Sequence, residues 1–341
     1  MSRKYYISLG ILLVAFFWTN YFIYTVSFEV SEKEAGANVA VVETEEKIEK
    51  QYPSVLNFGD VMFDRGVRNI MENRGRDPFE YMKRDMDLIK DFDVIIANLE
   101  GPIIEMNRDY CQQKAYNFQF ASTTPKLLKN VGINMVNIAN NHNQDCFLGG
   151  YESTKRYLQQ AGIDYIGDRE SEESYVLSMI DNKSMVFIGI DQTVSPALTL
   201  DFYSLVKKLD SENDYMVVNI HWGEEYSLKP NSTQIDIAHK LIDSGADMIF
   251  GHHPHVVQPV EVYNGGVIFY SLGNFVFDQD FGDTTVGLGA GVEFRNNKKV
   301  ITLFPFNIKV FAPEFMVGDE KDNFCEKFLN NIKHLGCEFT L

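Results

Sequence analysis

The sequence lacks the surplus of basic residues that nucleic-acid binding requires. Its 341 residues contain 31 Lys and Arg against 48 Asp and Glu, which gives a formal net charge of −17 at pH 7. A chain of this charge has no basic surface with which to neutralise phosphate groups. We therefore do not expect DNA or RNA among its partners.

Cysteine is also scarce. The chain has four cysteines and no CxxC pair, which argues against a structural zinc site and against a small disulfide scaffold. The even number permits two disulfides if the domain lies in an oxidising compartment. We expect Cys325 to pair with Cys337, because the intervening residues could close around the last helix, and Cys111 to pair with Cys146 near the site described below.

Three signatures of common hydrolases and nucleotide-binding proteins are missing. The sequence has no GxSxG elbow, no GxxxxGK[ST] phosphate loop and no HExxH helix, so the serine hydrolase, P-loop and zincin classes lack their defining residues. The Gly-rich segment GLGAG at 287–291 lies between strand-like residues with no helix after it. It predicts close strand packing rather than a phosphate loop.

One long hydrophobic run is present near the N-terminus. Residues 5–28 contain no charged residue, and as a helix they would be long enough to cross a hydrocarbon core of about 30 Å. Arg3 and Lys4 precede the run and acidic residues follow it, so the positive-inside rule predicts a single-pass anchor in the cell membrane with the C-terminal domain extracytoplasmic. A cleaved signal peptide, with Ala35 and Ala37 as an AxA pattern, and a buried core helix are the alternatives.

The chain after this run divides into two further parts. Residues 29–52 are rich in Glu and predict an acidic tether that is too polar to bury. Residues 53–341 form the predicted globular domain, and the hydrophobic content of the chain, 45%, is enough to build its core. Residues 1–28 are the predicted cytoplasmic tip and transmembrane anchor.

In the globular part, short apolar segments alternate with amphipathic segments, which is typical of α/β layering. Strand-like segments that end in polar residues are SVLNFGD, DVIIANLE, NMVNIAN, YMVVNIH and ADMIFGH. Helical periodicity extends over residues 77–91, 150–162, 231–245 and 319–336. Successive strand-like segments between 257 and 310, joined by NGG and RNNKK turns, predict a second, antiparallel sheet.

Residues that could bind a metal follow five of the strand-like segments. Ligands bind beyond the carboxyl ends of the strands in α/β sheets, and oxygen and imidazole donors without thiolate suit manganese, zinc or iron. Taken singly, several have ordinary explanations, such as a turn residue at Asp60 or a helix cap at Asn141. Their joint placement favours a metal site. The candidates are Asp60, Glu100, Asn141, His142, His221, His252, His253 and His255.

These residues lie in motifs that resemble the CapA capsule-biosynthesis family, also called PgsA in poly-γ-glutamate synthesis, a branch of the calcineurin-like metallophosphoesterases. The resemblance covers about residues 54–280, and the N-terminal anchor is also similar to that family. The matching segments are GDVMFDRG at 59–66, NLEGPI at 98–103, IANNHNQD at 138–145, HWGEEY at 221–226, GHHPHVVQPVE at 251–261 and YSLGNFVFDQ at 270–279.

The resemblance implies a four-layer αββα sandwich of two packed sheets flanked by helices, with two divalent metal ions at the strand ends. Glu100 would take the bridging position, and His142 would act behind the ligands as an acid or charge stabiliser near the leaving group. The resemblance gives His252 no firm role. The other implied ligands are Asp60 and His255 at one metal and Asn141, His221 and His253 at the second.

Two departures from the wider superfamily bear on activity. Met62 stands where the superfamily has a histidine ligand, and the longer Glu100 replaces the bridging Asp. The resemblance implies an extracytoplasmic protein of capsule biosynthesis or export, either for poly-γ-glutamate or for a polysaccharide, with hydrolysis of a phosphoester as its chemistry. The alternative is a non-catalytic protein that uses the metals to bind the capsule polymer or to organise its synthase or export complex.

Overall fold

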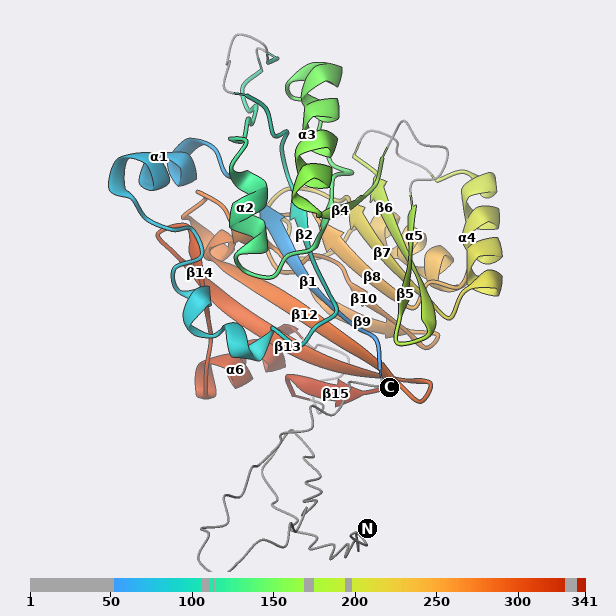
Figure 1. Ribbon diagram of the computed structural model, residues 1–341. Coiled ribbons are helices and arrows are strands. Elements are labelled where there is room, and N and C mark those ends of the chain that lie inside the picture. The colour runs from blue at the N-terminus through green and yellow to red at the C-terminus, as the bar shows by residue number, and fades with distance from the viewer. Residues whose placement is uncertain (1–51, 106–110, 113, 169–174, 194–197, 329–335) are drawn as a thin grey trace, which may run out of the picture. The chain divides into compact units, whose positions relative to one another are not determined.

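The computed structural model describes residues 52–105, 111–112, 114–168, 175–193, 198–328 and 336–341 (Figure 1). The predicted membrane span at residues 5–28 lies outside these residues, as does the predicted tether except for its last residue. Among the residues described, no helix has the length and apolarity needed to cross a membrane.

The described chain has a mixed α/β fold with two β-sheets, which confirms the predicted α/β class. The first sheet has the order β14 (Ala312–Phe315), β13 (Lys298–Lys309), β12 (Val286–Arg295), β1 (Ser54–Val61), β2 (Val94–Leu99), β3 (Met135–Asn137) and β4 (Asp164–Ile166), with β11 (Asn274–Val276) paired to β1 and β15 (Glu338–Thr340) paired to β13. The second sheet has the order β5 (Tyr175–Ile180), β6 (Lys183–Asp191), β7 (Tyr215–His221), β8 (Met248–His252), β10 (Gly266–Phe269) and β9 (Val260–Tyr263).

The strands between 257 and 310 do not form a sheet of their own, so that prediction was wrong. β10 pairs in parallel with β8, and β12 pairs antiparallel with β1. Each hairpin therefore extends one of the two existing sheets and satisfies the backbone groups of a strand that would otherwise be an edge. The predicted turns are confirmed, because Asn264 with Gly265 and Asn296 with Asn297 have positive φ between paired strands.

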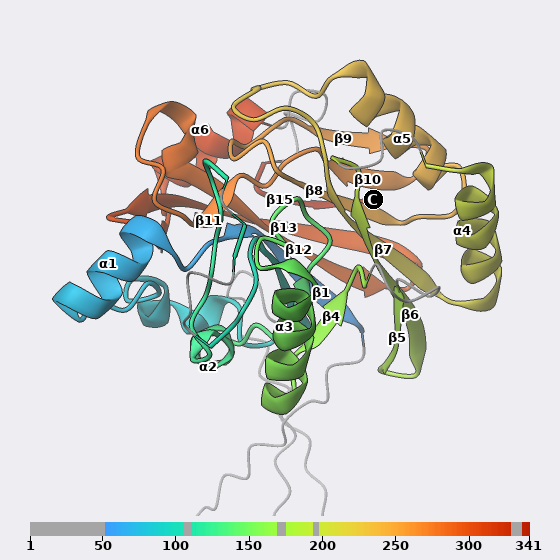
Figure 2. The same ribbon diagram turned by 90° about the horizontal axis from the view of Figure 1, so that it is seen from above.

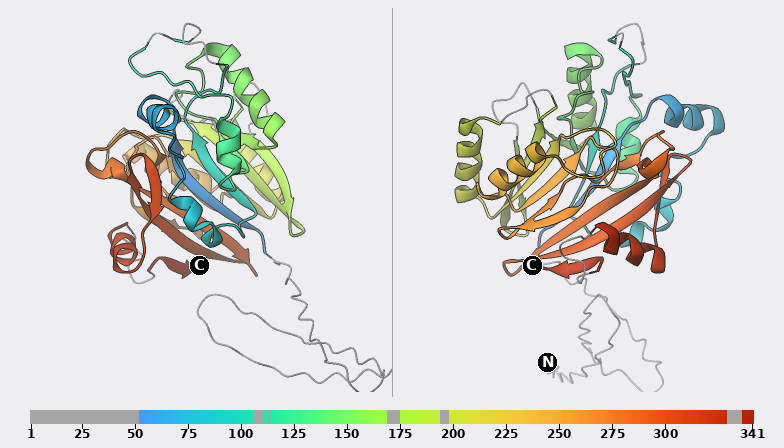
Figure 3. Two further views of the ribbon diagram at one scale, coloured as in Figure 1. Left: turned by 60° about the vertical axis from the view of Figure 1, so that its left-hand side comes forward. Right: turned by 180° about the vertical axis from the view of Figure 1, so that it is seen from behind.

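Helices cover the outer faces of the two sheets (Figures 2 and 3). Apolar side chains between the sheets include Ile96 from β2 and Phe250 from β8, while α2 and α3 pack on the first sheet and α4 and α5 on the second. The helices are α1 (Arg65–Arg74), α2 (Thr124–Lys129), α3 (Phe147–Ala161), α4 (Leu200–Glu212), α5 (Ser232–Ile242) and α6 (Asp319–Phe328).

Two of the predicted helices differ in extent from the structure. Residues 77–91 contain only the 3₁₀ turns η1 (Met82–Arg84) and η2 (Met86–Leu88). Asp residues interrupt the segment, and their short polar side chains favour turns over helix interiors: Asp77 accepts the Phe79 N–H at 2.9 Å. The last predicted helix, 319–336, is present as α6 up to Phe328, and 329–335 lie outside the described residues.

The Gly-rich segment at 287–291 packs as predicted. It lies within β12, and a Cβ atom on Gly289 would come within 2.6 Å of the Phe58 ring. β1, β2 and β3 are mutually parallel in the first sheet, and β7 and β8 are parallel in the second. The carboxyl ends of both sets of strands carry the candidate site residues.

Candidate metal centre

Asp60 lies near the carboxyl end of β1, where the strand meets β11. A Cβ atom on the preceding Gly59 would lie 1.9 Å from the carbonyl oxygen of Gly273, so only glycine fits there. The close approach lets the Asp60 N–H donate to that oxygen at 3.0 Å. Asp60 and Asn274 consequently lie opposite one another in the register of β1 and β11.

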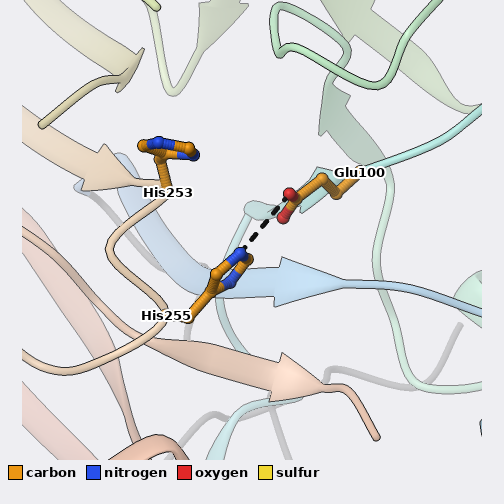
Figure 4. Close-up of side chains that lie close together, drawn as sticks. All are labelled: Glu100, His253 and His255. Atoms are coloured by element: carbon orange, nitrogen blue, oxygen red, sulfur yellow. Dashed lines mark ion pairs between the residues drawn. The ribbon is translucent and has the colours of Figure 1, made fainter. Parts of the chain in front are cut away.

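Glu100, His253 and His255 form a compact donor group (Figure 4). One possible ligand atom from each lies within 4.8 Å of the others. Glu100 follows β2 of the first sheet, whereas the histidines follow β8 of the second. The Glu100 carboxylate faces the His255 ring, with 3.7 Å between Oε1 and Nε2.

This group contains buried polar atoms that protein groups do not satisfy. Glu100 is fully buried, and neither carboxylate oxygen forms a hydrogen bond with a described residue. The Nδ1 atom of His253 likewise has no hydrogen-bond partner among the described residues. Burial raises the pKa of Glu100 well above its ordinary value, because an isolated charge is costly in the interior. A bound cation would complete both groups.

His255 is oriented by two oxygen atoms behind its ring. Its Nδ1 lies 3.0 Å from Asn274 Oδ1 and 3.2 Å from Asp60 Oδ2, so Nδ1 carries a proton. Burial alone would lower the pKa of His255, but the negative charges of Glu100 and Asp60 raise it to about 9. Hydrogen bonds of this kind fix the orientation of histidines that bind metals.

The backbone of the GHHPH loop is held in an uncommon conformation. φ is 96° at His253 and 58° at His255, and non-glycine residues in this region cost about 1–3 kcal/mol each and cluster at binding sites. The His253 N–H contributes to holding the loop, because it donates to Asp60 Oδ2 at 3.3 Å. The loop thus presents both imidazoles to Glu100 at a cost in backbone energy.

Asn141 and His221 lie together at the same end of the strands. His221 Nε2 is 2.9 Å from Asn141 Oδ1. The His221 ring centroid is 4.7 Å from that of His253, so Asn141 and His221 lie next to the group of Glu100, His253 and His255. Burial lowers the pKa of His221 well below its ordinary value, which keeps the ring neutral, as metal binding requires.

His142 points its outer nitrogen at Glu100. The Nδ1–H donates to Asp145 Oδ2 at 2.7 Å, which leaves Nε2 facing Glu100 Oε1 at 3.9 Å. The imidazole also packs on the ring of Phe118, with 4.1 Å between centroids. Burial lowers the pKa of His142, and the hydrogen bond to Asp145 opposes this shift. The residue is therefore supported by Asp145 and Phe118 on one side and open to the site on the other.

The structure places all seven residues predicted for the site, Asp60, Glu100, Asn141, His142, His221, His253 and His255, at one end of the two sheets. Two asparagines that the sequence did not single out also belong there. Asn98 Nδ2 lies 2.7 Å from Asp60 Oδ1 and 3.2 Å from His221 Nδ1, and Asn274 supports His255 as described above. Two signals point to Asn98: it begins the family segment NLEGPI, and its position two residues before Glu100 in DVIIANLE gives it the same side of the strand.

His252 and Met62 differ in character from the donor group. His252 is fully buried, donates from Nε2 to Asn219 at 3.1 Å, and has its pKa lowered to about 4 by burial. The Met62 side chain belongs to the apolar core, where its sulfur accepts the Asp64 N–H at 3.0 Å. Position 62 therefore contributes a core thioether and no imidazole to the site.

Comparison with known proteins gives one family match. The model of the family "Bacterial capsule synthesis protein PGA_cap" matches residues 54–279. The chain is 31% identical over 290 residues to the capsule biosynthesis protein CapA of Bacillus anthracis, which covers 78% of this chain and 70% of that protein. It is 34% identical over 239 residues to the PGA biosynthesis protein CapA of Bacillus subtilis (strain 168), which covers 65% of this chain and 62% of that protein.

Among solved structures the likeness is more distant. The protein TT1561 of Thermus thermophilus aligns over 76% of this chain and 100% of its own, with 10% identity and a TM-score of 0.46. A predicted phosphoesterase of Streptococcus pneumoniae TIGR4 aligns over 85% of this chain and 98% of its own, with 11% identity and a TM-score of 0.32.

Proposed function

The chain belongs to the bacterial capsule synthesis family PGA_cap, and on this premise we propose that it is a membrane-anchored, extracytoplasmic protein of capsule biosynthesis whose metal centre hydrolyses a phosphoester. The name of the Bacillus subtilis relative, a PGA biosynthesis protein, favours poly-γ-glutamate as the capsule polymer. The uncharged run at 5–28 and its flanking charges support the anchor.

The observation that carries the proposal is the buried Glu100 carboxylate. Its oxygens form no hydrogen bond with the described residues, and His253 and His255 direct imidazole nitrogens toward it. A carboxylate with imidazoles suits manganese, zinc or iron. Asp60 with His255 would hold one ion and Asn141 with His221 and His253 a second, with Glu100 between them.

The chain's own residues fit hydrolysis at this centre. Divalent ions activate water and neutralise phosphoryl charge when bound. His142 faces the site with Nε2, and Asp145 holds its other nitrogen, so a protonated His142 could donate to the leaving group. Phe118 packs on His142 and limits the ring's movement.

The test combines metal analysis with substrate screening of the full-length protein in detergent. We expect bound manganese, zinc or iron and hydrolysis of at least one phosphoester in a panel. A protein that holds no divalent ion after incubation with manganese and zinc would contradict the proposal as a whole.

A non-catalytic role is the second candidate, and the Met62 side chain favours it. Because Met62 is buried in the core, one metal would have one ligand fewer than in the wider superfamily. Such a centre could bind the capsule polymer or organise its synthase without hydrolysing a phosphoester. Full capsule production by cells that carry a His142→Gln variant would favour this candidate.

A further inference from the structure

Arg65 lies at the start of α1, directly after the segment that carries Asp60. Its side chain is 33% exposed, and its guanidinium carbon lies 5.0 Å from the centroid of Phe118 and 5.6 Å from that of Phe277. Cations bind favourably at aromatic rings at such distances. The two rings therefore fix where the positive charge stands.

The same two rings contact the histidines of the metal centre. Phe118 packs on His142, with 4.1 Å between centroids, and Phe277 packs on His255, with 4.7 Å. One aromatic ring thus connects Arg65 to each of the two histidines. This places the guanidinium beside the metal centre without making it a ligand.

The carboxylates of Asp64 and Asp278 hold Arg65 in place. Its N–H donates to Asp64 Oδ1 at 2.7 Å, and the N–H of Gly66 donates to Asp278 Oδ2 at 2.8 Å. The side chain pairs with Asp278 through Nε and Nη2. Its backbone has a φ of 47°, and such conformations in non-glycine residues cluster at binding sites.

The guanidinium retains unused donors. Arginine has five N–H groups, and the contacts of Asp278 with Nε and Nη2 account for two of them. Nη1 has no hydrogen-bond partner among the described residues, and the side chain is open to solvent. Lys114 adds a second cation nearby, paired with Asp145 at 2.5 Å behind His142. In a chain with a net charge of −17, these two cations offset the negative charges of Asp278 and Asp145 at this place.

We propose that Arg65 forms a subsite for an oxyanion beside the metal centre and holds a second carboxylate or phosphate group of the ligand. The proposal rests on the proposed function, because the first group is the one bound at Glu100, His253 and His255. A ligand with acidic groups at intervals along a chain satisfies both positions at once. Arg65 accordingly adds affinity for an acidic group of the ligand, whether a carboxylate or a phosphate.

The test measures binding of two probes, a short γ-linked glutamate oligomer and inorganic phosphate, to the full-length protein with and without manganese. We expect Arg65→Met to bind at least one probe about tenfold more weakly, which is the loss of a charge-assisted hydrogen bond, while its manganese content is unchanged. A loss confined to the oligomer identifies a carboxylate subsite, and a loss confined to phosphate identifies a phosphate subsite.

The matched control is Arg76→Met. Arg76 also pairs with a carboxylate, Glu80, and lies 5.8 Å from a ring, that of Tyr81, but it follows the far end of α1. Unchanged affinity of Arg65→Met for both probes would overturn the inference.

Arg65→Lys keeps the inference testable if Arg65→Met does not fold. It keeps the charge but loses the planar fork, so it should lie between wild type and Arg65→Met in affinity, and wild-type affinity in this variant would also overturn the inference. An absence of bound manganese in the wild-type protein contradicts the proposed function instead, and the comparison of variants in the metal-free protein still tests Arg65.

Discussion

His221 Nε2 and Asn141 Oδ1 lie 2.9 Å apart although they are 80 residues apart in the chain. His221 is the last residue of β7 in the second sheet, and Asn141 follows β3 of the first. Glu100 likewise follows a strand of the first sheet, β2, whereas His253 and His255 follow a strand of the second, β8. A metal bound here would therefore link the two sheets and stabilise the packing between them.

Loss of a donor should remove metal-dependent stability. A ligand that binds only the folded state at 100 times its Kd raises the free energy of unfolding by about 2.7 kcal/mol. We expect manganese or zinc to raise the Tm of the wild-type protein and to leave that of His255→Ala unchanged, as measured by thermal unfolding. His239→Ala is the control, because His239 lies on α5 and contacts Glu261 and Tyr263 of β9, so this variant should keep the full increase. An equal increase in His255→Ala would exclude His255 as a ligand.

Replacement of His142 should separate catalysis from metal binding. His142 Nε2 faces Glu100, and its loss removes a proton donor but no predicted ligand. We expect His142→Gln to retain wild-type metal content and to lose about 100-fold or more in the rate of phosphoester hydrolysis, which is within the range for acid–base groups. Loss of bound metal in this variant would instead show that His142 is a ligand.

Asn98 should affect the metal centre by positioning the side chains of Asp60 and His221. Its Oδ1 accepts from Asn137 and Asn140 at 3.0 and 3.3 Å, while its Nδ2 contacts Asp60 and His221. Asn98→Leu removes the hydrogen-bond donor to Asp60 Oδ1 and His221 Nδ1, whereas Asn137 and Asn140 still donate to the carbonyl oxygens of Ala139 and Leu99. We therefore expect the free energy of unfolding to fall by at least about 2 kcal/mol, measured by denaturant unfolding.

Asn98→Asp provides the comparison for this prediction. It keeps the acceptor but places a second carboxylate beside Asp60. A divalent ion should reverse most of the destabilisation of Asn98→Asp, because it neutralises the added charge, and little of that of Asn98→Leu. Equal recovery in both variants would show that Asn98 does not act at the metal centre.

The two disulfides should differ in their effect on activity. The structure contains both predicted pairs, Cys111–Cys146 and Cys325–Cys337. Cys146 follows Asp145, which accepts the N–H of Phe118 at 2.6 Å and holds His142.

Replacing either disulfide by a pair of serines should lower the free energy of unfolding by about 2–4 kcal/mol. Only the loss of Cys111–Cys146 should also lower the rate of hydrolysis at constant metal content, because it loosens the segments that position His142. The measurement is the rate of phosphoester hydrolysis by both double variants, at a temperature where each is folded. Equal rates would exclude a positioning role for the first disulfide.

The anchored topology predicts that protease reaches the domain from outside. Residues 5–28 are uncharged, and Arg3 and Lys4 precede them, so protease added to intact cells should remove the domain while a cytoplasmic marker survives. Immunoblotting of the treated cells provides the measurement. Resistance of the domain, or a mature N-terminus at Asn38 as a cleaved signal peptide would give, would contradict the anchor.

Local patterns in the chain were enough to identify the residue types of the site and the family. The strand ends at Asp60, Glu100 and His221 could be predicted from a few neighbouring residues. A buried apolar run followed by a polar residue marks the end of a strand wherever that strand lies in the sheet. The same holds for the turns at Asn264 and Asn296 and for the disulfide Cys325–Cys337, whose cysteines are 12 residues apart in sequence. The family motifs are likewise contiguous segments that can be read without knowing the fold.

The order of the strands in the two sheets became clear from the fold alone. The pairing of β10 with β8 and of β12 with β1 joins segments far apart in sequence, and no local pattern distinguishes this arrangement from a separate antiparallel sheet. The contacts of Asn98 with Asp60 and His221 could not be predicted for the same reason. Nor could the contact of Asn274 with His255. A hydrogen bond between side chains depends on three-dimensional position, and an asparagine in an apolar run has the same local pattern whether or not a distant histidine lies opposite it.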